Sequence, residues 1–145
     1  MKKIQACFAL VATSAVVLAA EPPPMHAVSP APADARVYII EPLDGATVPQ
    51  TFTVKFGVEG IDIAPAGTDQ PHSGHHHLLV DIATLPDLTV PLPANEHILH
   101  FGKGQTETQL TLAPGSHTLQ LVFANYLHIA QKPALVSKRI TVTVK

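Results

Sequence analysis

Short runs in which apolar and polar residues alternate are the feature that most constrains how this chain folds. In the segment TFTVKFGV, residues 51–58, Phe52, Val54 and Phe56 fall on one face and the polar residues between them on the other. This two-residue period is that of a β-strand with one buried face. We expect further strands over 36–42, 75–82, 96–102, 106–112, 117–124 and 139–145, and no helix.

Turn residues separate these runs at short intervals. An Asp-Gly pair at 44–45, a Pro-Gly pair at 114–115 and a Gly-Lys-Gly sequence at 102–104 each favour a tight turn. About seven strands at this spacing predict one all-β domain, an immunoglobulin-like two-sheet β-sandwich, with a small open barrel as the alternative. The longest irregular stretches, 59–74 and 83–95, flank the strand at 75–82, and long loops on a rigid sandwich often carry sites.

The first 35 residues differ from the rest of the chain. Two lysines precede an uncharged apolar run from Ile4 to Ala20, and Glu21 and three prolines follow it. This order is typical of a secretory signal peptide over 1–20, although the run is also at the lower length limit of a retained membrane anchor. Residues 21–35 are rich in proline and alanine and predict a flexible lead-in to a domain over 36–145. We therefore expect a periplasmic or secreted protein with no membrane span after signal cleavage.

Removal of this signal changes the chemistry that the chain offers. The only cysteine, Cys7, is lost, which leaves no thiolate for catalysis, a zinc ribbon or a blue-copper centre. Of nine Lys and Arg residues, Lys2 and Lys3 are also lost, so seven remain against eleven acidic residues, a net charge of −4 with histidine neutral. No basic patch is visible, so nucleic acid is not an expected partner. All nine histidines remain, an enrichment that suggests a use for imidazole.

Three of the histidines are consecutive at the start of the strand expected at 75–82. Residues two apart in a strand share a face, with Cα atoms about 6.6 to 7 Å apart, so His75 and His77 lie together and His76 points the other way. Because imidazole nitrogens bind zinc at about 2.0–2.1 Å, two such rings can tilt onto one ion. His100, at the end of another strand, and His128, in the loop after the strand at 117–124, are expected to complete a metal site. A structural or pH-responsive role for the pair is the alternative.

Cu(II) or Zn(II) is the expected cofactor, since neutral imidazole suits both ions. Met25 is the only methionine after the signal, which argues against a methionine-rich Cu(I) carrier. Three residues are expected around the ligands: His76 at the edge of the core, Asp81 on the face of the histidine pair, and Glu107. Asp81 can ligate the ion or orient a ring. Glu107 is either an outer carboxylate or a solvated strand residue.

The other histidines and hydroxyl groups give weaker indications. His97 is expected at the surface, His117 either caps a turn or ligates, and His26 reaches a site only if the lead-in docks on the domain. Ser73 lies near the histidines, but no Gly-x-Ser-x-Gly elbow surrounds it. Because no pair of nucleophile and base can be named, we do not expect an enzyme.

Two stretches, GHHHLLVD at 74–81 and HFGKGQTETQLTLAPGSHTLQLVFAN at 100–125, resemble the bacterial domain-of-unknown-function 4399 family of small exported proteins. The resemblance runs from about Arg36 to Lys145 and includes His128 and the segment VSKRITVTV at 136–144. It implies an exported domain, with 74–79 as the family's His-rich strand and 100–108 as its second motif. Where family members often have a second histidine after His128, this chain has Gln131. The family has no established activity.

A second, shorter likeness favours copper. The segment EPLDGATVPQTFTVKFGV at 41–58 is similar to the opening of CopC-type periplasmic copper-resistance proteins, which are also β-sandwiches. The leading hypothesis is thus an exported domain that binds Cu(II) or Zn(II) as a carrier or buffer. The alternative is a non-catalytic structural or adhesive module of the cell envelope, with scaffolding histidines and another envelope protein as its partner.

Overall fold

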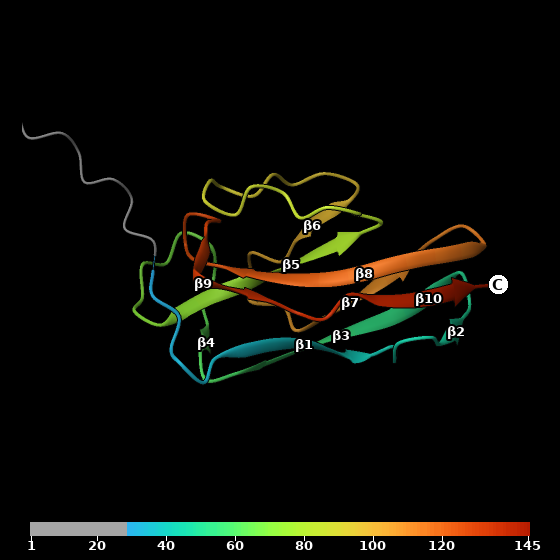
Figure 1. Cartoon of the computed structure of the whole chain (residues 1–145), viewed down its shortest axis with the longest axis horizontal. Coiled ribbons are helices and arrows are strands. Elements are labelled where there is room, and N and C mark those ends of the chain that lie inside the picture. Colours follow the sequence, from blue (N-terminus) through green and yellow to red (C-terminus); the bar gives the residue numbers. More distant parts are fainter. Residues whose placement is uncertain (1–28) are drawn as a thin grey trace, which may run out of the picture.

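A computed structural model describes residues 29–145, which form ten β-strands and no helix (Figure 1). Within this range there is accordingly no helix of the length and apolarity needed to cross a membrane. The signal peptide expected at 1–20 and His26 lie outside the described residues.

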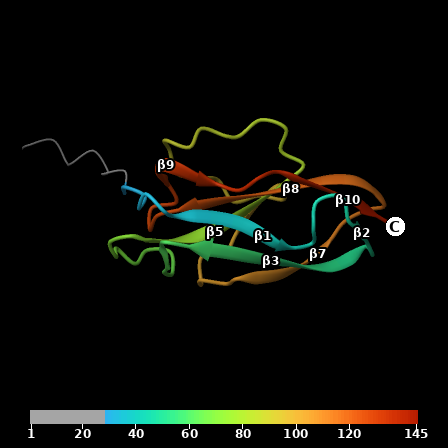
Figure 2. The same cartoon turned by 60° about the horizontal axis from the view of Figure 1, so that its bottom comes forward.

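The strands form two sheets that lie face to face (Figure 2). The smaller sheet is antiparallel and has the order β1 (Arg36–Glu41), β3 (Thr51–Glu59) and β7 (Glu107–Thr111). The larger sheet has the order β2 (Thr47–Val48), β10 (Ile140–Val144), β8 (Gly115–Ala124), β5 (Ser73–Val80) and β4 (Asp62–Ile63). Two further strands complete it: the short β6 (Ile98–His100) pairs with β5, and β9 (Ala130–Val136) pairs with β8. The expected all-β, two-sheet fold is confirmed.

Alternation along the strands builds the main core between the sheets. Phe52, Val54 and Phe56 of β3 belong to one buried cluster with Leu121 and Phe123 of β8. The same period appears in β10, where every second residue from Ile140 to Val144 is buried. The faces predicted from the sequence are therefore the faces that the sandwich buries.

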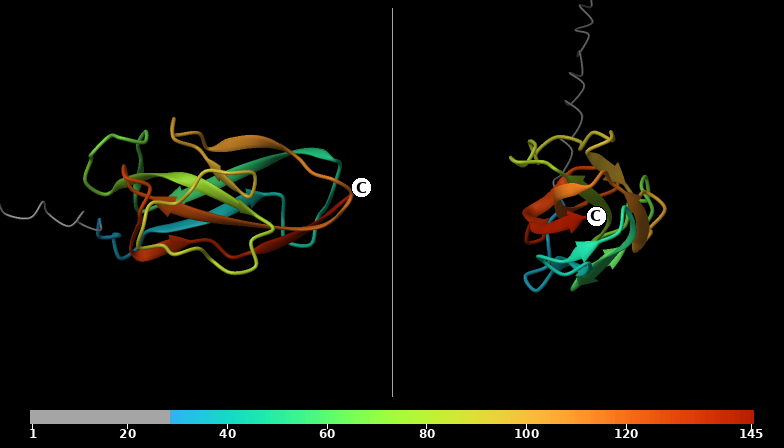
Figure 3. Two further views of the ribbon diagram at one scale, coloured as in Figure 1. Left: turned by 90° about the horizontal axis from the view of Figure 1, so that it is seen from above. Right: turned by 90° about the vertical axis from the view of Figure 1, so that its right-hand side faces the viewer.

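Strand β5 is buried on both faces over its whole length. All eight of its residues are buried, and Leu78 and Val80 belong to the core between the sheets. On the outer face, Leu79 packs in a second cluster with Leu92. Leu92 belongs to the long connection 81–97, which crosses the outer face of the larger sheet (Figure 3). This connection covers side chains that a bare sheet would expose to water.

The strand boundaries differ from expectation where local backbone conformation intervenes. β5 ends at Val80 because Asp81 adopts the left-handed region, with φ of 57°. The short strands β2 and β4 were not expected, and neither was β9, which contains Pro133. Proline cannot donate a hydrogen bond within a sheet, so its presence conceals a strand in the sequence.

The described part of the proline-rich lead-in lies along β9. Pro30 forms a parallel bridge with Lys132. The N–H of Ala31 donates to the carbonyl of Lys132 at 3.0 Å, and the N–H of Lys132 donates to the carbonyl of Ser29 at 3.0 Å. Among the described residues, contact with the sandwich is thus already present at Ser29, before the Arg36 boundary expected from the sequence.

Candidate metal centre

Four imidazoles meet on the outer face of the larger sheet. His75 and His77 come from β5, His100 is the last residue of β6, and His128 lies in the connection between β8 and β9. His77 and His100 are partners in the register of β5 with β6, and partners in neighbouring strands share a face. Strand pairing therefore places His100 beside His75 and His77, and the connection after β8 brings His128 to them.

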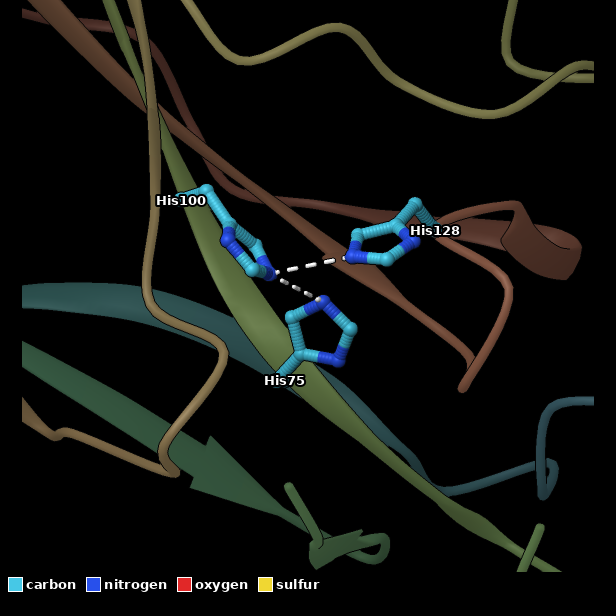
Figure 4. Close-up of side chains that lie close together, drawn as sticks. All are labelled: His75, His100 and His128. Atoms are coloured by element: carbon cyan, nitrogen blue, oxygen red, sulfur yellow. Dashed lines mark hydrogen bonds between the residues drawn. The ribbon is translucent and has the colours of Figure 1, made fainter. Parts of the chain in front are cut away.

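Three of the rings point their Nε2 atoms at one another (Figure 4). The Nε2 atom of His100 is 3.2 Å from that of His75 and 3.1 Å from that of His128. Nitrogens bound at about 2.0–2.1 Å to one tetrahedral ion are about 3.3 Å apart. The spacing around His100 is therefore close to that of three corners of a zinc coordination sphere.

Hydrogen bonding alone does not account for this arrangement. A neutral imidazole carries one N–H and one lone pair, on different nitrogens. The Nε2 atom of His100 can therefore donate one hydrogen or accept one, and cannot bond fully to His75 and His128 at once. A cation between the rings would instead engage all three lone pairs.

The fourth ring, that of His77, lies against the other three. Its centroid is 4.9 Å from that of His75, 5.1 Å from that of His100 and 5.9 Å from that of His128. Neither of its ring nitrogens has a hydrogen-bond partner, and the side chain is fully buried. His77 is thus near the other nitrogens but does not belong to the group of three whose ligand atoms lie within 4.8 Å of one another.

Burial keeps these rings uncharged. Burial above all, and the neighbouring imidazoles after it, lower the pKa of His75 to about 4 and that of His77 to about 3. The pKa of His100 is also lowered, by burial and by His128. At neutral pH His75, His77 and His100 are neutral, the form in which imidazole binds a metal.

The turn that carries His128 is held by one buried side chain. The Oδ1 atom of Asn125 accepts hydrogen bonds from the N–H groups of Leu127 at 3.0 Å and Ile129 at 3.1 Å. His128 itself adopts the left-handed region, with φ of 66°, which is uncommon for a residue other than glycine. Such backbone strain is concentrated at functional sites, and here it accompanies a ring directed at His100.

Two glycines near the histidines lie where a Cβ atom does not fit, Gly102 under a ring and Gly74 against the neighbouring strand. A Cβ atom on Gly102 would lie 2.3 Å from Cε1 and 2.5 Å from Nε2 of His100, so no larger residue fits under that ring. A Cβ on Gly74 would lie 2.3 Å from the carbonyl oxygen of Ala124, in the neighbouring strand β8. Gly74 directly precedes His75, and Gly102 is two residues after His100. This proximity was the available sequence indication for the two glycines, and from the sequence we assigned no role in the site to either of them or to Asn125.

The remaining candidates lie away from the cluster. The ring of His76 points between the sheets, with centroid distances of 5.2 Å to Phe56 and 5.0 Å to Phe123. Asp81 accepts hydrogen bonds from Nδ1 of His117 at 2.7 Å and from the N–H of Thr118 at 2.9 Å. Glu107 is exposed at the start of β7, in the smaller sheet.

The other residues singled out in the sequence have partners of their own. His97 is exposed, and its Nδ1 atom is 3.1 Å from the carbonyl oxygen of Val80. Gln131, at the position where a second histidine is expected, is buried and donates from Nε2 to the carbonyl of Ser73 at 3.2 Å. The structure thus assembles His75, His77, His100 and His128, and places the other expected residues elsewhere.

Comparison with known proteins gives one family. The sequence model described as Domain of unknown function (DUF4399) matches residues 54–145, which is more than half of the chain and includes the four clustered histidines. No curated protein and no solved structure matched the chain.

Proposed function

This chain belongs to the DUF4399 family, and we propose that it is an exported domain that binds one divalent transition metal ion through His75, His100 and His128. It acts as a carrier or buffer of Cu(II) or Zn(II) in the periplasm. The observation that carries the proposal is the convergence of three Nε2 atoms from three chain segments, 3.1–3.2 Å apart around His100.

The donor set suits these ions. The ligand group contains imidazoles and neither a carboxylate nor a thiolate among the described residues. Calcium and magnesium prefer oxygen ligands, whereas neutral imidazole is a common ligand of Zn(II) and Cu(II). Since His75 and His100 are held neutral by burial, no proton has to leave them when the ion binds at neutral pH.

The same molecule shows what a scaffolding histidine looks like, and the cluster differs from it. His117 bonds through Nδ1 to Asp81 and through Nε2 to the carbonyl of Ala113 at 2.8 Å. By contrast, the Nε2 atoms of His75, His100 and His128 face one another and not a carboxylate or a carbonyl. This contrast favours metal binding over the alternative of a purely structural envelope module.

Calorimetric titration of the purified domain with zinc or copper(II) salts at neutral pH tests the proposal. We expect one ion per chain, and binding at least about 100-fold weaker in the double variant His75→Ala, His100→Ala, because two of three ligands are lost. The variant His97→Gln, which changes an exposed histidine outside the cluster, is the matched control and should bind as the unaltered chain does. Equal binding by the double variant, or no binding by the unaltered chain, would overturn the proposal.

A further inference from the structure

His77 is a buried imidazole on the same face of β5 as His75, and the three-histidine site leaves it unused. It is fully buried on the outer face of β5, and both ring nitrogens lack a hydrogen-bond partner. An imidazole without partners in such a place is costly, because its nitrogens have lost water and gained nothing. Its ring nevertheless contacts His75 and His100, which are themselves ligand candidates.

The four ring centroids define a shape that can be compared with coordination geometries. Their six separations are 4.9 Å for His75–His77, 4.9 Å for His75–His100, 5.1 Å for His75–His128, 5.1 Å for His77–His100, 5.9 Å for His77–His128 and 4.7 Å for His100–His128. A ring bound through one nitrogen has its centroid roughly 3.2 Å from the ion. Four such rings are then all roughly 5.2 Å apart in a tetrahedron, whereas a square gives four separations of roughly 4.5 Å and two of roughly 6.4 Å.

The observed separations are those of a slightly distorted tetrahedron. Only one pair, His77–His128, exceeds 5.1 Å, while a square needs two long diagonals. The pair opposite to it, His75–His100, is at 4.9 Å, far short of a diagonal.

We infer that His77 is the fourth ligand, and that four neutral imidazoles form a closed tetrahedral site that favours Zn(II) over Cu(II). This inference rests on the proposed function and specifies its metal. Tetrahedral nitrogen sites suit Zn(II), whereas Cu(II) prefers a square-planar or tetragonal arrangement. To join the ion, the ring of His77 turns about its Cβ–Cγ bond, a torsion with broad minima, and breaks no hydrogen bond in doing so.

No other described side chain competes for the fourth position. The oxygens of Asp81 accept hydrogen bonds from His117 and Thr118, and Glu107 lies in the smaller sheet. Filling of the fourth position by His77 leaves no place for water or a small anion on the ion. A closed sphere of this kind is typical of metal storage or structural sites, and catalytic zinc sites keep one position open.

Cobalt(II) and azide make the fourth ligand visible. The domain loaded with Co(II) should show the intense visible absorption of tetrahedral cobalt, and added azide should leave the spectrum unchanged. In His77→Leu the ion keeps three ligands, so the spectrum should become azide-sensitive and zinc affinity should fall roughly tenfold or more. The ratio of Cu(II) to Zn(II) affinity should rise in this variant, since the tetrahedral restraint is relaxed. The matched control His97→Leu should behave as the unaltered chain does.

X-ray absorption on the zinc-loaded unaltered chain is a readout that does not depend on any variant. Four imidazole nitrogens at about 2.0 Å are expected. Three imidazoles with one water, or azide binding to the unaltered cobalt form, would overturn this inference and leave the proposed function standing. If the unaltered chain binds neither zinc nor cobalt, both fail.

Discussion

At Gly102, a single hydrogen in place of a side chain decides whether His100 can reach the other histidines. A Cβ atom there would lie 2.3 Å from Cε1 of His100, a distance that forces the ring to move. We expect Gly102→Ala to weaken zinc binding by roughly tenfold or more while the fold is retained, because a shift of the ring removes one ligand. Calorimetric titration measures the affinity, and circular dichroism checks the fold.

Gly57→Ala is the matched control for this steric effect. Its Cβ would also meet a ring at 2.3 Å, but the ring is that of Tyr38 in the smaller sheet. Both variants should lose some stability, and only Gly102→Ala should lose affinity. If the two variants bind zinc equally well, His100 is not a ligand.

His76 is a buried ring that lies on the other face of β5 and does not contact the histidine cluster. It lies between Phe56 and Phe123, and both of its nitrogens lack partners. Replacement of an unpartnered buried polar group by an apolar one of similar size removes its desolvation penalty. We expect His76→Leu to raise the free energy of unfolding of the metal-free domain by about 1–2 kcal/mol at pH 7, measured by urea denaturation.

The benefit of His76→Leu should grow in acid. Burial lowers the pKa of His76 from 6.5 to about 4, so between these values the unfolded chain binds a proton that the folded chain does not. Stability therefore falls as the pH falls through this window, by up to about 3 kcal/mol for this residue alone. Between pH 7 and pH 4.5 the urea midpoint of the metal-free domain should fall more in the unaltered chain than in His76→Leu. An equal fall in both chains would show that His76 is not the acid-sensitive group.

At the level of elements, β5 shows which features of the fold and of the candidate site could be predicted from the sequence. The alternation of its residues places His75 and His77 on one face and His76 on the other, as expected. The sequence does not show that both faces of β5 are buried. The outer face is covered by the irregular connection 81–97, whose apolar residues follow no strand or helix periodicity and so gave no sign of where it packs. The convergence of histidines from two paired strands could be predicted. The place of Asp81 could not, since its left-handed φ turns it away from the face it would have shared.

His117 of β8 links Asp81, the residue after β5, to Ala113 in the connection between β7 and β8. Nδ1 of His117 faces a carboxylate and Nε2 faces the carbonyl of Ala113, two acceptors that the protonated ring can satisfy at once because both of its nitrogens donate. The hydrogen bond to Asp81 raises the pKa of His117. Burial raises the pKa of Asp81, but the hydrogen bonds from His117 and Thr118 outweigh it and lower that pKa.

This pair should stabilise the fold with a pH dependence opposite to that of His76. Because the folded pKa of His117 is raised, its contribution is complete below pH 6.5 and is lost as the pH rises through the folded value. We expect His117→Phe to cost about 1 kcal/mol at pH 6 and less at pH 9. Urea denaturation of the metal-free domain at both pH values measures this, and an equal cost at both would mean that packing, not charge, is responsible.

On the scale of the whole molecule, the site depends on segments that only the folded sheet brings together. His100 is 25 residues from His75 and 28 from His128 along the chain, so an unfolded chain does not hold their nitrogens within one coordination sphere. An ion that binds there therefore binds the folded state and stabilises it by mass action. A metal bound instead by scattered surface histidines would have no such preference for the folded chain.

Thermal unfolding distinguishes these two modes of binding. At free zinc equal to 100 times the dissociation constant the folded state gains about 2.7 kcal/mol, which for a domain of this size raises the Tm by roughly 10 °C. The rise should disappear with a chelator and in the double variant His75→Ala, His100→Ala, and magnesium should not cause it, because magnesium requires oxygen ligands. If zinc binds by calorimetry yet leaves the Tm unchanged, the ion is held where folded and unfolded chains are alike. In that case the convergence of imidazoles on the outer face of β5 has another cause.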